Sequence, residues 1–358
     1  MTRLTWEPIT LHFRTPFRVS YGTSETRRAH WLRLADDEGW GEGTIPPYYG
    51  ISDASMAAVW DAAARRTDPF PDDPAAVAAW LAADPAIAAG PAPARAALDL
   101  ALHDRLGRRA GLPLHALLGL PAPRPLPTSF TLGIDEPEVM AQQAAELVGR
   151  SVIKLKLGAT DGRDADRVAA VRAARPDATL YVDANAGWSP EAAVGHIERL
   201  AALGVALIEQ PVAKDDIAGM GFVQRHVAVP VVADESLQTL ADVDRLAAAG
   251  VGGINLKLMK VGGLGPGLAV LRRARELGMG VMLGCMIETA VGATAMAHLM
   301  GLADWLDLDA PWLVADDPFD GLTYDDAGRV HVPDRPGIGV VRQEESHAKT
   351  QRTPSSEF

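Results

Sequence analysis

Short apolar stretches alternate with helical segments over residues 121–312. Each intervening segment can hold one helix, most clearly at 189–203 and 264–277. This alternation predicts parallel strands joined by helical crossovers, and the number of strands favours a closed (β/α) barrel over an open sheet. The predicted strands lie at residues 128–133, 151–157, 179–185, 205–210, 229–235, 252–259, 279–287 and 304–309.

The first 120 residues follow a different pattern. Two stretches rich in β-formers come first, at 8–20 and 29–44, and Ala-rich stretches typical of helices follow at 53–66, 74–84 and 92–108. Four prolines between residues 121 and 127 indicate a boundary. We therefore predict an α/β fold with an α+β capping domain over 1–120, a modified TIM barrel over 121–312, a return of 313–341 to the capping domain, and a polar tail over 343–358.

The composition narrows the classes of partner. The chain carries 34 Lys and Arg against 46 Asp and Glu, a net charge of −12, and no basic run stands out. These features argue against nucleic acid and anionic membrane surfaces as partners. No apolar run is long enough to span a membrane, and the first residues lack the apolar stretch of a signal peptide. Cys285 is the single cysteine, so no intrachain disulfide can form, and we expect a cytoplasmic protein.

Two lysines lie two residues apart in the second predicted barrel strand. Residues two apart on a strand share a face, so Ile153 and Leu155 would contact the helices. Lys154 and Lys156 would then point into the barrel. Solvated lysines on an edge strand are the alternative, but a closed barrel has no edge. Burying two ammonium groups this close together is unfavourable unless they have a function.

The next three strands end in acids at matching positions. Asp183, Glu209 and Asp234 are separated by 26 and 25 residues, one strand–helix unit each. They would therefore converge at the C-terminal mouth of the barrel, where barrel enzymes keep their active sites. Any single acid could instead be a helix N-cap. Three carboxylates without His or Cys select a hard cation, Mg²⁺ first and Mn²⁺ as a second choice. Asn185 could support these ligands, and strand alternation turns Glu235 away from them.

A further lysine follows one strand later. Alternation places Lys257 in the same mouth, across the barrel from Lys156, and predicts that Lys260 is a surface or helix-entry residue. A cation that binds a substrate carboxylate can stabilise an enediolate, while one lysine removes the α-proton and the other returns one. A base must be neutral, and free lysine has a pKa of about 10.4. Desolvation and neighbouring cations, such as Lys154 beside Lys156, would lower it.

These residues together resemble the enolase superfamily, muconate-lactonising subgroup, over nearly the whole chain. The resemblance includes Gly41-Glu42-Gly43 in the capping domain and Asp104-Arg105-Leu106-Gly107. It implies that the three acids bind Mg²⁺ and that the two opposed lysines, Lys156 and Lys257, are the acid/base pair. It also implies that Lys154 contacts the substrate carboxylate or tunes Lys156.

The last strand carries a second informative pair of acids. Asp307 and Asp309 would share a face and point into a mouth that already holds three acids, which suggests a cationic substrate group such as an α-ammonium. Loop capping is the alternative. The pair resembles the Asp-x-Asp motif of dipeptide epimerases, which holds the N-terminal amine of the dipeptide. By the same resemblance Thr131 and Cys285 line the substrate site, although ordinary packing would also account for them.

The lid loop bears on substrate choice. Epimerases that act on Ala-Glu should carry a cation there, whereas Tyr21 stands at the matching position. The aromatic pair at 48–49 strengthens the expectation of an apolar or aromatic second residue, although Arg18 could compensate. We therefore predict Mg²⁺-dependent epimerisation of L,L-dipeptides at the C-terminal residue, with a small-molecule dipeptide as the partner. Homo-oligomerisation is left open.

Two other functions remain open at this point. The first is another reaction of the subgroup, namely N-acylamino-acid racemisation, o-succinylbenzoate synthesis or cycloisomerisation. Asp307 and Asp309 argue against it, because those substrates carry no free amine. The second is a catalytically silent barrel that only binds a metal and a ligand. Retention of both Lys156 and Lys257 argues against that.

Overall fold

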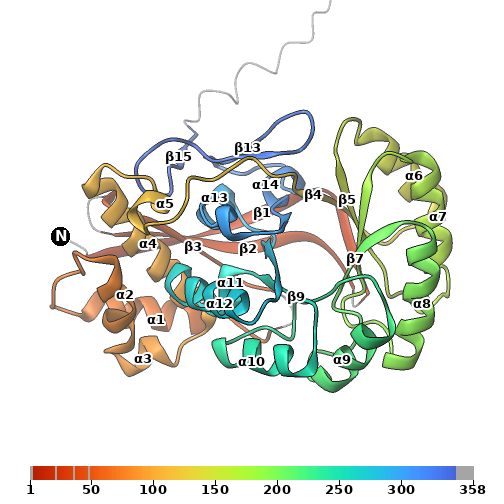
Figure 1. Cartoon of the computed structure of the whole chain (residues 1–358). Coiled ribbons are helices and arrows are strands. Elements are labelled where there is room, and N and C mark those ends of the chain that lie inside the picture. The colour runs from red at the N-terminus through yellow and green to blue at the C-terminus, as the bar shows by residue number, and fades with distance from the viewer. Residues whose placement is uncertain (1–2, 21, 35–36, 47–48, 344–358) are drawn as a thin grey trace, which may run out of the picture.

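Eight parallel strands form the barrel predicted from the sequence (Figure 1). The computed structural model describes residues 3–20, 22–34, 37–46 and 49–343. Each barrel strand neighbours the next in chain order, and an isolated parallel bridge between Thr128 and Leu306 joins the first strand to the last. The strands are β4 (Ser129–Leu132), β5 (Val152–Lys156), β6 (Thr179–Asp183), β7 (Val205–Glu209), β8 (Val231–Ala233), β9 (Gly253–Leu256), β10 (Gly280–Gly284) and β11 (Trp305–Asp307).

Helices surround the barrel and contact its outward-facing side chains. They are α6 (Pro137–Glu146), α7 (Asp164–Ala174), α8 (Pro190–Ala202), α9 (Ile217–His226), α10 (Leu240–Ala249), α11 (Leu258–Val261), α12 (Leu264–Glu276) and α13 (Ala290–Ala297). As predicted, Ile153 and Leu155 of β5 are buried in the core between strands and helices. Successive side chains of a strand point to opposite faces. Because Ile153 and Leu155 pack outward against the helices, Lys154 and Lys156 point into the barrel.

The inside of the barrel has an apolar base and a polar mouth. A separate cluster fills the base with Val152, Tyr181, Leu207, Val232 and Met282, against which Trp305 packs. On five of these six strands the residue two positions after the base residue is charged, and on β10 it is Gly284. Because residues two apart on a strand face the same side, each charged side chain lies one layer nearer the mouth than the apolar residue at the base of the barrel.

A three-stranded antiparallel sheet forms the capping domain. Its strands are β1 (Leu4–Val19), β2 (Gly22–Leu34) and β3 (Trp40–Thr44), and its helices are α1 (Asp53–Arg65), α2 (Pro74–Ala82), α3 (Pro85–Ala88), α4 (Ala92–Ala110) and α5 (Leu114–Leu117). The β-rich stretch predicted at 29–44 is divided between β2 and β3. The sheet packs closely on α4, because a Cβ at Gly41 would lie 2.0 Å from the carbonyl oxygen of Ala97.

A buried carboxylate joins the capping domain to the barrel. Glu42 of β3 accepts hydrogen bonds from Thr289 N (2.8 Å), Thr289 Oγ1 (2.6 Å) and Gly292 N (3.1 Å) at the start of α13. An acid at a helix N-terminus satisfies backbone N–H groups that have no partner within the helix. Burial raises the pKa of Glu42, and these hydrogen bonds counteract the rise. Glu42 of the Gly-Glu-Gly motif thus fixes the capping sheet against the seventh barrel unit.

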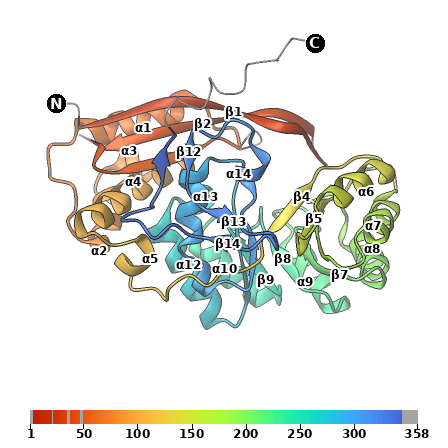
Figure 2. The ribbon, with the colours of Figure 1, turned by 90° about the horizontal axis from the view of Figure 1, so that it is seen from above.

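The β1–β2 ribbon extends over the mouth of the barrel. In both ribbon views it runs from the N-terminal helices toward β5 and α6 (Figures 1 and 2). Ile134 N donates to Arg18 O (2.9 Å), and Ser20 Oγ donates to Asn185 O (3.1 Å). Further from the tip, in the middle of β1, Phe13 forms an antiparallel bridge with Val314. The tip of the ribbon therefore lies over the β4 and β6 ends, and its middle lies beside residue 314.

The C-terminal segment contacts both parts of the chain. It comprises α14 (Ala310–Leu313), β12 (Phe319–Asp320), β13 (Thr323–Tyr324), β14 (Val330–His331) and β15 (Val341–Arg342). Gly337 O of this segment accepts a hydrogen bond from Leu114 N of the capping domain (3.0 Å). Gly328 O of this segment accepts one from Thr128 N, directly before β4 of the barrel (3.0 Å). The division into 1–120, 121–312 and 313–341 stays a prediction, and beyond residue 343 the predicted tail lies outside the described residues.

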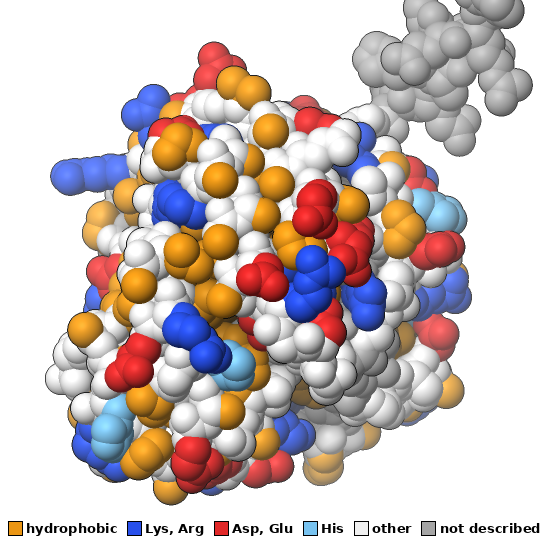
Figure 3. Space-filling view, turned by 90° about the vertical axis from the view of Figure 1, so that its right-hand side faces the viewer, with side chains coloured by type: hydrophobic (Ala, Val, Ile, Leu, Met, Phe, Trp, Pro, Cys, Tyr) orange, Lys and Arg blue, Asp and Glu red, His pale blue; other side chains and the backbone are white. Residues whose placement is uncertain are grey.

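The outer face that carries α6, α7 and α8 shows charged side chains of both signs among apolar ones (Figure 3). Within the described ranges, no helix combines the length and the apolar character required to cross a bilayer.

Candidate active site

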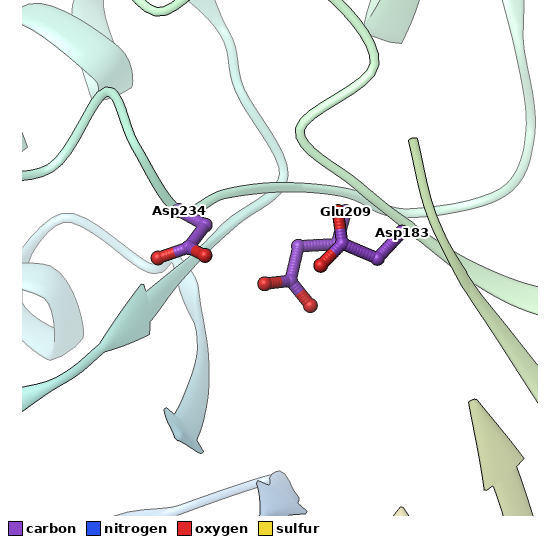
Figure 4. Close-up of side chains that lie close together, drawn as sticks. All are labelled: Asp183, Glu209 and Asp234. Carbon is purple, nitrogen blue, oxygen red and sulfur yellow. The ribbon is translucent and has the colours of Figure 1, made fainter. Parts of the chain in front are cut away.

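Three carboxylates meet at the mouth of the barrel. One oxygen each of Asp183, Glu209 and Asp234 lies within 4.8 Å of the other two, and all three residues are buried (Figure 4). Asp183 and Glu209 are register partners on β6 and β7, and Asp234 follows β8 directly. The structure therefore brings together the three acids that strand spacing had matched.

Neighbouring side chains and backbone orient the first two acids. Asn255 Nδ2 donates to Glu209 Oε1 (2.9 Å), and Asn185 N donates to Asp183 Oδ1 (2.8 Å). Asn185 has a φ of 42°, a left-handed conformation that places its N–H beside the carboxylate two residues earlier. Asn185 therefore supports the ligand Asp183, as expected, and it does so through its backbone N–H.

Gln210 organises the loop of the third acid. It follows Glu209 in a left-handed conformation with a φ of 36°. Its Oε1 accepts from Asp234 N (3.0 Å) and Ser236 N (3.2 Å), and its Nε2 donates to Ser236 Oγ (2.9 Å). One buried amide therefore holds the backbone of the Asp234 loop against the end of β7.

Lys156 and Lys257 lie on opposite sides of the three acids. Lys156 Nζ donates to Asp183 Oδ2 (2.6 Å) from β5, and Lys257 Nζ donates to Asp234 Oδ2 (2.8 Å) from the end of β9. The acid-bearing strands β6, β7 and β8 lie between β5 and β9 in the sheet. The opposed placement expected from strand alternation is therefore present in the structure.

Lys154 lies at the centre of the buried charges. Its Nζ is 2.7 Å from Asp307 Oδ2, 2.7 Å from Glu209 Oε2 and 3.3 Å from Asp183 Oδ2. Burial opposes its charge, but the three carboxylates outweigh burial and raise the pKa of Lys154 well above its usual value. Lys154 is therefore a fixed cation beside the acids.

The prediction that Lys260 lies on the surface is wrong, although it does lie in a short helix before α12, as the helix-entry alternative expected. Lys260 is buried, and its Nζ donates to Asp234 Oδ1 (2.5 Å), Asp234 O (2.5 Å) and Asn255 O (3.1 Å). The strand that alternation extended to residue 259 ends at Leu256, and α11 follows. In a helix, residues three apart are neighbours, so Lys260 returns to the side of Lys257.

The prediction that Glu235 points away from the acids is also wrong. Because β8 ends at Ala233, strand alternation no longer applies two residues later. Glu235 is buried, and Asn185 Nδ2 donates to its Oε1 (3.2 Å). Burial raises the pKa of Glu235 to about 7, and the nearby charges of Asp234 and Asp183 add to this rise.

The second pair of acids, Asp307 and Asp309, lies where the last strand β11 meets the first strand β4, a junction that we call the β11–β4 seam. Asp307 Oδ1 accepts from Ser129 Oγ (2.6 Å), and Asp309 Oδ2 accepts from Thr131 N (2.7 Å). Only Asp307 belongs to β11, since Asp309 is the N-cap of α14. Burial and Asp307 raise the pKa of Asp309 to about 6, whereas Lys154 lowers the pKa of Asp307 despite burial.

A cavity of about 330 Å³ connects these groups under the β1–β2 ribbon. Thr131 and Cys285 line it, together with the three lysines Lys154, Lys156 and Lys257 and the acids Asp234, Asp307 and Asp309. The capping domain contributes Phe17, Val19, Gly22, Thr23, Ser24, Arg27 and Pro46. Tyr21 lies outside the described residues, so its expected place in the lid stays a prediction.

The three clustered acids fit a divalent cation. Oxygen-only ligands suit Mg²⁺ or Mn²⁺. Among the described residues, several buried oxygens of this region have no hydrogen-bond partner, namely Asn185 Oδ1, Glu209 Oε2 and Glu235 Oε2. Glu209 Oε2 is near Lys154 Nζ but lacks hydrogen-bond geometry. Buried unsatisfied oxygens beside three converging carboxylates are the environment that a bound cation would complete.

Known protein families agree with this geometry. Residues 3–119 match the mandelate racemase/muconate lactonizing enzyme N-terminal domain, and residues 139–346 match the enolase C-terminal domain-like family. The chain belongs to the enolase superfamily. It is 34% identical over 346 residues to a hydrophobic dipeptide epimerase from Roseobacter litoralis, covering 95% of this chain and 98% of the relative. It is 33% identical over 344 residues to an L-Ala-D/L-Glu epimerase from Bacteroides thetaiotaomicron, covering 95% and 88%.

A solved structure of the superfamily has the same architecture. The dipeptide epimerase from Enterococcus faecalis V583, complexed with Mg and the dipeptide L-Leu-L-Tyr, matches with a TM-score of 0.87 at 31% identity. The match covers 95% of this chain and 99% of that chain. The resemblance to the superfamily that was drawn from the lysines and acids is therefore confirmed.

Sequence reasoning missed three residues that hold the acids in place. They are Gln210, Asn255 and Lys260. Asn255 lies on β9 two residues before Lys257, and alternation places both inside the barrel, but no sequence pattern indicates its contact with Glu209. Gln210 acts from a left-handed conformation and Lys260 from a short helix, and no periodic pattern marks either of them.

We expect Lys260→Met to lower the free energy of unfolding by about 3 kcal/mol. Removing one partner of a buried ion pair leaves an uncompensated charge, and Asp234 would keep only Lys257. Urea unfolding followed by tryptophan fluorescence measures the change. Lys214→Met is the matched control, because Lys214 is exposed and should change stability by less than about 0.5 kcal/mol. Equal stability losses in the two variants would contradict the buried role of Lys260.

Proposed function

We propose that the protein is a Mg²⁺-dependent dipeptide epimerase that inverts the α-carbon of the C-terminal residue of L,L-dipeptides. The observation that carries the proposal is the arrangement of one cavity. Opposed lysines flank a cluster of three acids, and a second pair of acids lies at the β11–β4 seam of the same cavity. The dipeptide epimerases among its relatives support the same activity.

Asp183, Glu209 and Asp234 would hold the cation. When bound, the ion supplies the positive charge that offsets the second negative charge on the substrate carboxylate as the α-proton leaves. Asn255, Gln210 and Lys260 keep the ligands in place, as outer residues do at metal sites. Asp183 and Asp234 also contact the two lysines, so the same acids set the positions of the acid/base groups.

Lys156 and Lys257 would serve opposite faces of the α-carbon. One lysine accepts the α-proton, and the electron pair of the broken C–H bond moves into the carboxylate to give an enediolate. The other lysine then donates a proton to the opposite face, which forms a new C–H bond and inverts the centre. The reaction is reversible and needs no further reactant, because one proton is removed and one is returned.

Asp307 and Asp309 would hold the α-ammonium of the dipeptide. Two carboxylates in a buried setting make strong charge-assisted hydrogen bonds to an ammonium. Each already accepts a hydrogen bond from β4, which fixes its direction. Lys154 contacts both Asp307 and Glu209, so it ties the amine end of the cavity to the metal end.

We propose an apolar or aromatic second residue for the substrate. Phe17 and Val19 line the lid side of the cavity, and Met286 and Ile287 follow β10. An apolar side chain transferred from water to such a surface gains free energy in proportion to the area it buries. The similarity to the hydrophobic dipeptide epimerase of Roseobacter litoralis supports this preference. The relative named as an L-Ala-D/L-Glu epimerase acts instead on a dipeptide whose second residue is acidic.

The division of labour between the lysines predicts a specific isotope pattern. Lys156→Ala and Lys257→Ala should each slow epimerisation by at least about a thousandfold, because each removes one of the two proton-transfer groups. In D₂O each variant should still exchange the α-proton of the one diastereomer that faces its remaining lysine. Proton NMR of L,L- and L,D-dipeptides measures this exchange, with Lys214→Ala as the control. Exchange of the same diastereomer by both variants would exclude opposed bases.

Masking the amine should separate a dipeptide epimerase from an N-acylamino-acid racemase. N-acetylation of L-Ala-L-Phe should lower kcat/KM by at least about a hundredfold, because it removes charge-assisted bonds worth about 3 kcal/mol and leaves two carboxylates unpaired. Asp309→Asn should weaken binding of the unmodified dipeptide but leave the affinity for Mg²⁺ unchanged. Polarimetric rates give kcat/KM, and chelated enzyme serves as the blank. Faster turnover of N-acylated compounds would assign the racemase activity instead.

A further inference from the structure

We propose that Arg27 makes the enzyme select dipeptides whose N-terminal residue has an acidic side chain. This inference rests on the proposed dipeptide epimerisation and adds a specificity for the first residue. Arg27 lines the catalytic cavity from strand β2 of the capping domain and is half-buried there. Among the described capping residues that line the cavity, it is the one with a charge.

The fold of the ribbon directs Arg27 toward the barrel. Two residues further along β2, Ala29 is fully buried against Leu11, Val314 and Ile287. Residues two apart on a strand share a face, so Arg27 lies on the same inward side. Its guanidinium is 5.8 Å from the ring centre of Phe13, a contact with an aromatic face that restricts the orientation of the planar group.

Arg27 lies at the amine end of the cavity. Its neighbour Phe13 bridges to Val314, directly after α14, and α14 begins from Asp309. The tip of the same ribbon lies elsewhere, since Ser20 Oγ contacts Asn185 O beside the three acids. A dipeptide with its ammonium at Asp309 and its carboxylate toward Asp183 would therefore place its first side chain nearest Arg27.

The charges at this end favour an acidic side chain. With Asp307 and Asp309 binding the ammonium of the substrate, the Arg27 guanidinium is the cation that the described part of the capping domain presents to this end of the cavity. Arginine binds carboxylates through a planar pair of N–H donors and repels a lysine side chain. The second residue would meet Phe17 and Val19 instead, so its apolar preference and the acidic preference of the first residue are compatible.

The test compares three substrates that differ only in the first residue, L-Glu-L-Phe, L-Gln-L-Phe and L-Lys-L-Phe. The neutral isostere Gln isolates the charge. We expect kcat/KM to be about tenfold higher for the Glu substrate than for the Gln substrate, and higher for Gln than for Lys. Arg27→Gln should remove the difference between Glu and Gln, and Arg27→Glu should favour L-Lys-L-Phe.

Arg28→Gln is the matched control. Arg28 is the next residue of β2 and is exposed, where it contacts Asp53 and Thr10. This variant should keep the wild-type order of the three substrates. Circular dichroism checks that each variant is folded, and the rate of Arg28→Gln on L-Ala-L-Phe checks that a substitution on this strand outside the cavity leaves the enzyme active.

The outcomes separate this inference from the proposed function. Equal rates for the Glu and Gln substrates, or an unchanged ratio in Arg27→Gln, would overturn the role of Arg27 while L-Ala-L-Phe is still epimerised. A preference for L-Ala-L-Glu that Arg27→Gln abolishes would place Arg27 at the second residue and also overturn it. No epimerisation of any dipeptide would reject the proposed function itself.

Discussion

The balance of charge inside the barrel mouth is the constraint on which the rest of the site depends. Four lysines and six carboxylates are buried there, namely Lys154, Lys156, Lys257 and Lys260 with Asp183, Glu209, Asp234, Glu235, Asp307 and Asp309. Isolated charges could not be buried at this depth, because desolvation would cost several kcal/mol for each ion. The groups are tolerated because each lies within the field of an opposite charge.

The count of these charges explains the site's preference for a divalent cation. Fully ionised, these four positive and six negative groups sum to −2, and buried Glu288 near Lys257 adds no charge because burial and Glu42 raise its pKa well above the usual value. A divalent ion cancels that excess, and a zwitterionic dipeptide adds no net charge. Without the ion, burial and the neighbouring carboxylates raise the pKa of Glu209 to about 8 and that of Glu235 to about 7, so protons partly replace it. An N-acylated substrate would instead bring one uncompensated negative charge.

Sequence patterns predicted this site along the regular strands and for the first residue beyond a strand end, such as Asp234 and Lys257. Alternation correctly placed Lys154, Lys156 and Asp183 inside the barrel, because each lies within a strand whose other face packs on helices. It failed for Glu235 and Lys260, which follow the ends of β8 and β9.

The remaining gaps in prediction have the same physical origin. Asp309 enters the cavity as a helix cap, and Gln210 acts from a left-handed conformation. No hydrophobic period marks Gln210, whereas Asp309 lines the cavity as predicted although it caps a helix and is not part of a strand. The number and order of barrel strands followed from the apolar stretches, since each strand must be buried on its outer face. The lid position of Arg27 depends on how the ribbon lies over the barrel, which no local pattern specifies.

Proton release on Mg²⁺ binding tests the charge balance most directly. The raised pKa values of Glu209 and Glu235 mean that the folded protein without the ion carries extra protons at pH 7, and the cation should displace them. Calorimetric titration of Mg²⁺ at pH 7 in two buffers of different ionisation enthalpy counts these protons. This charge balance predicts release of about one proton per ion and an affinity that rises from pH 6 to pH 8. Binding with no proton release and no dependence on pH would contradict it.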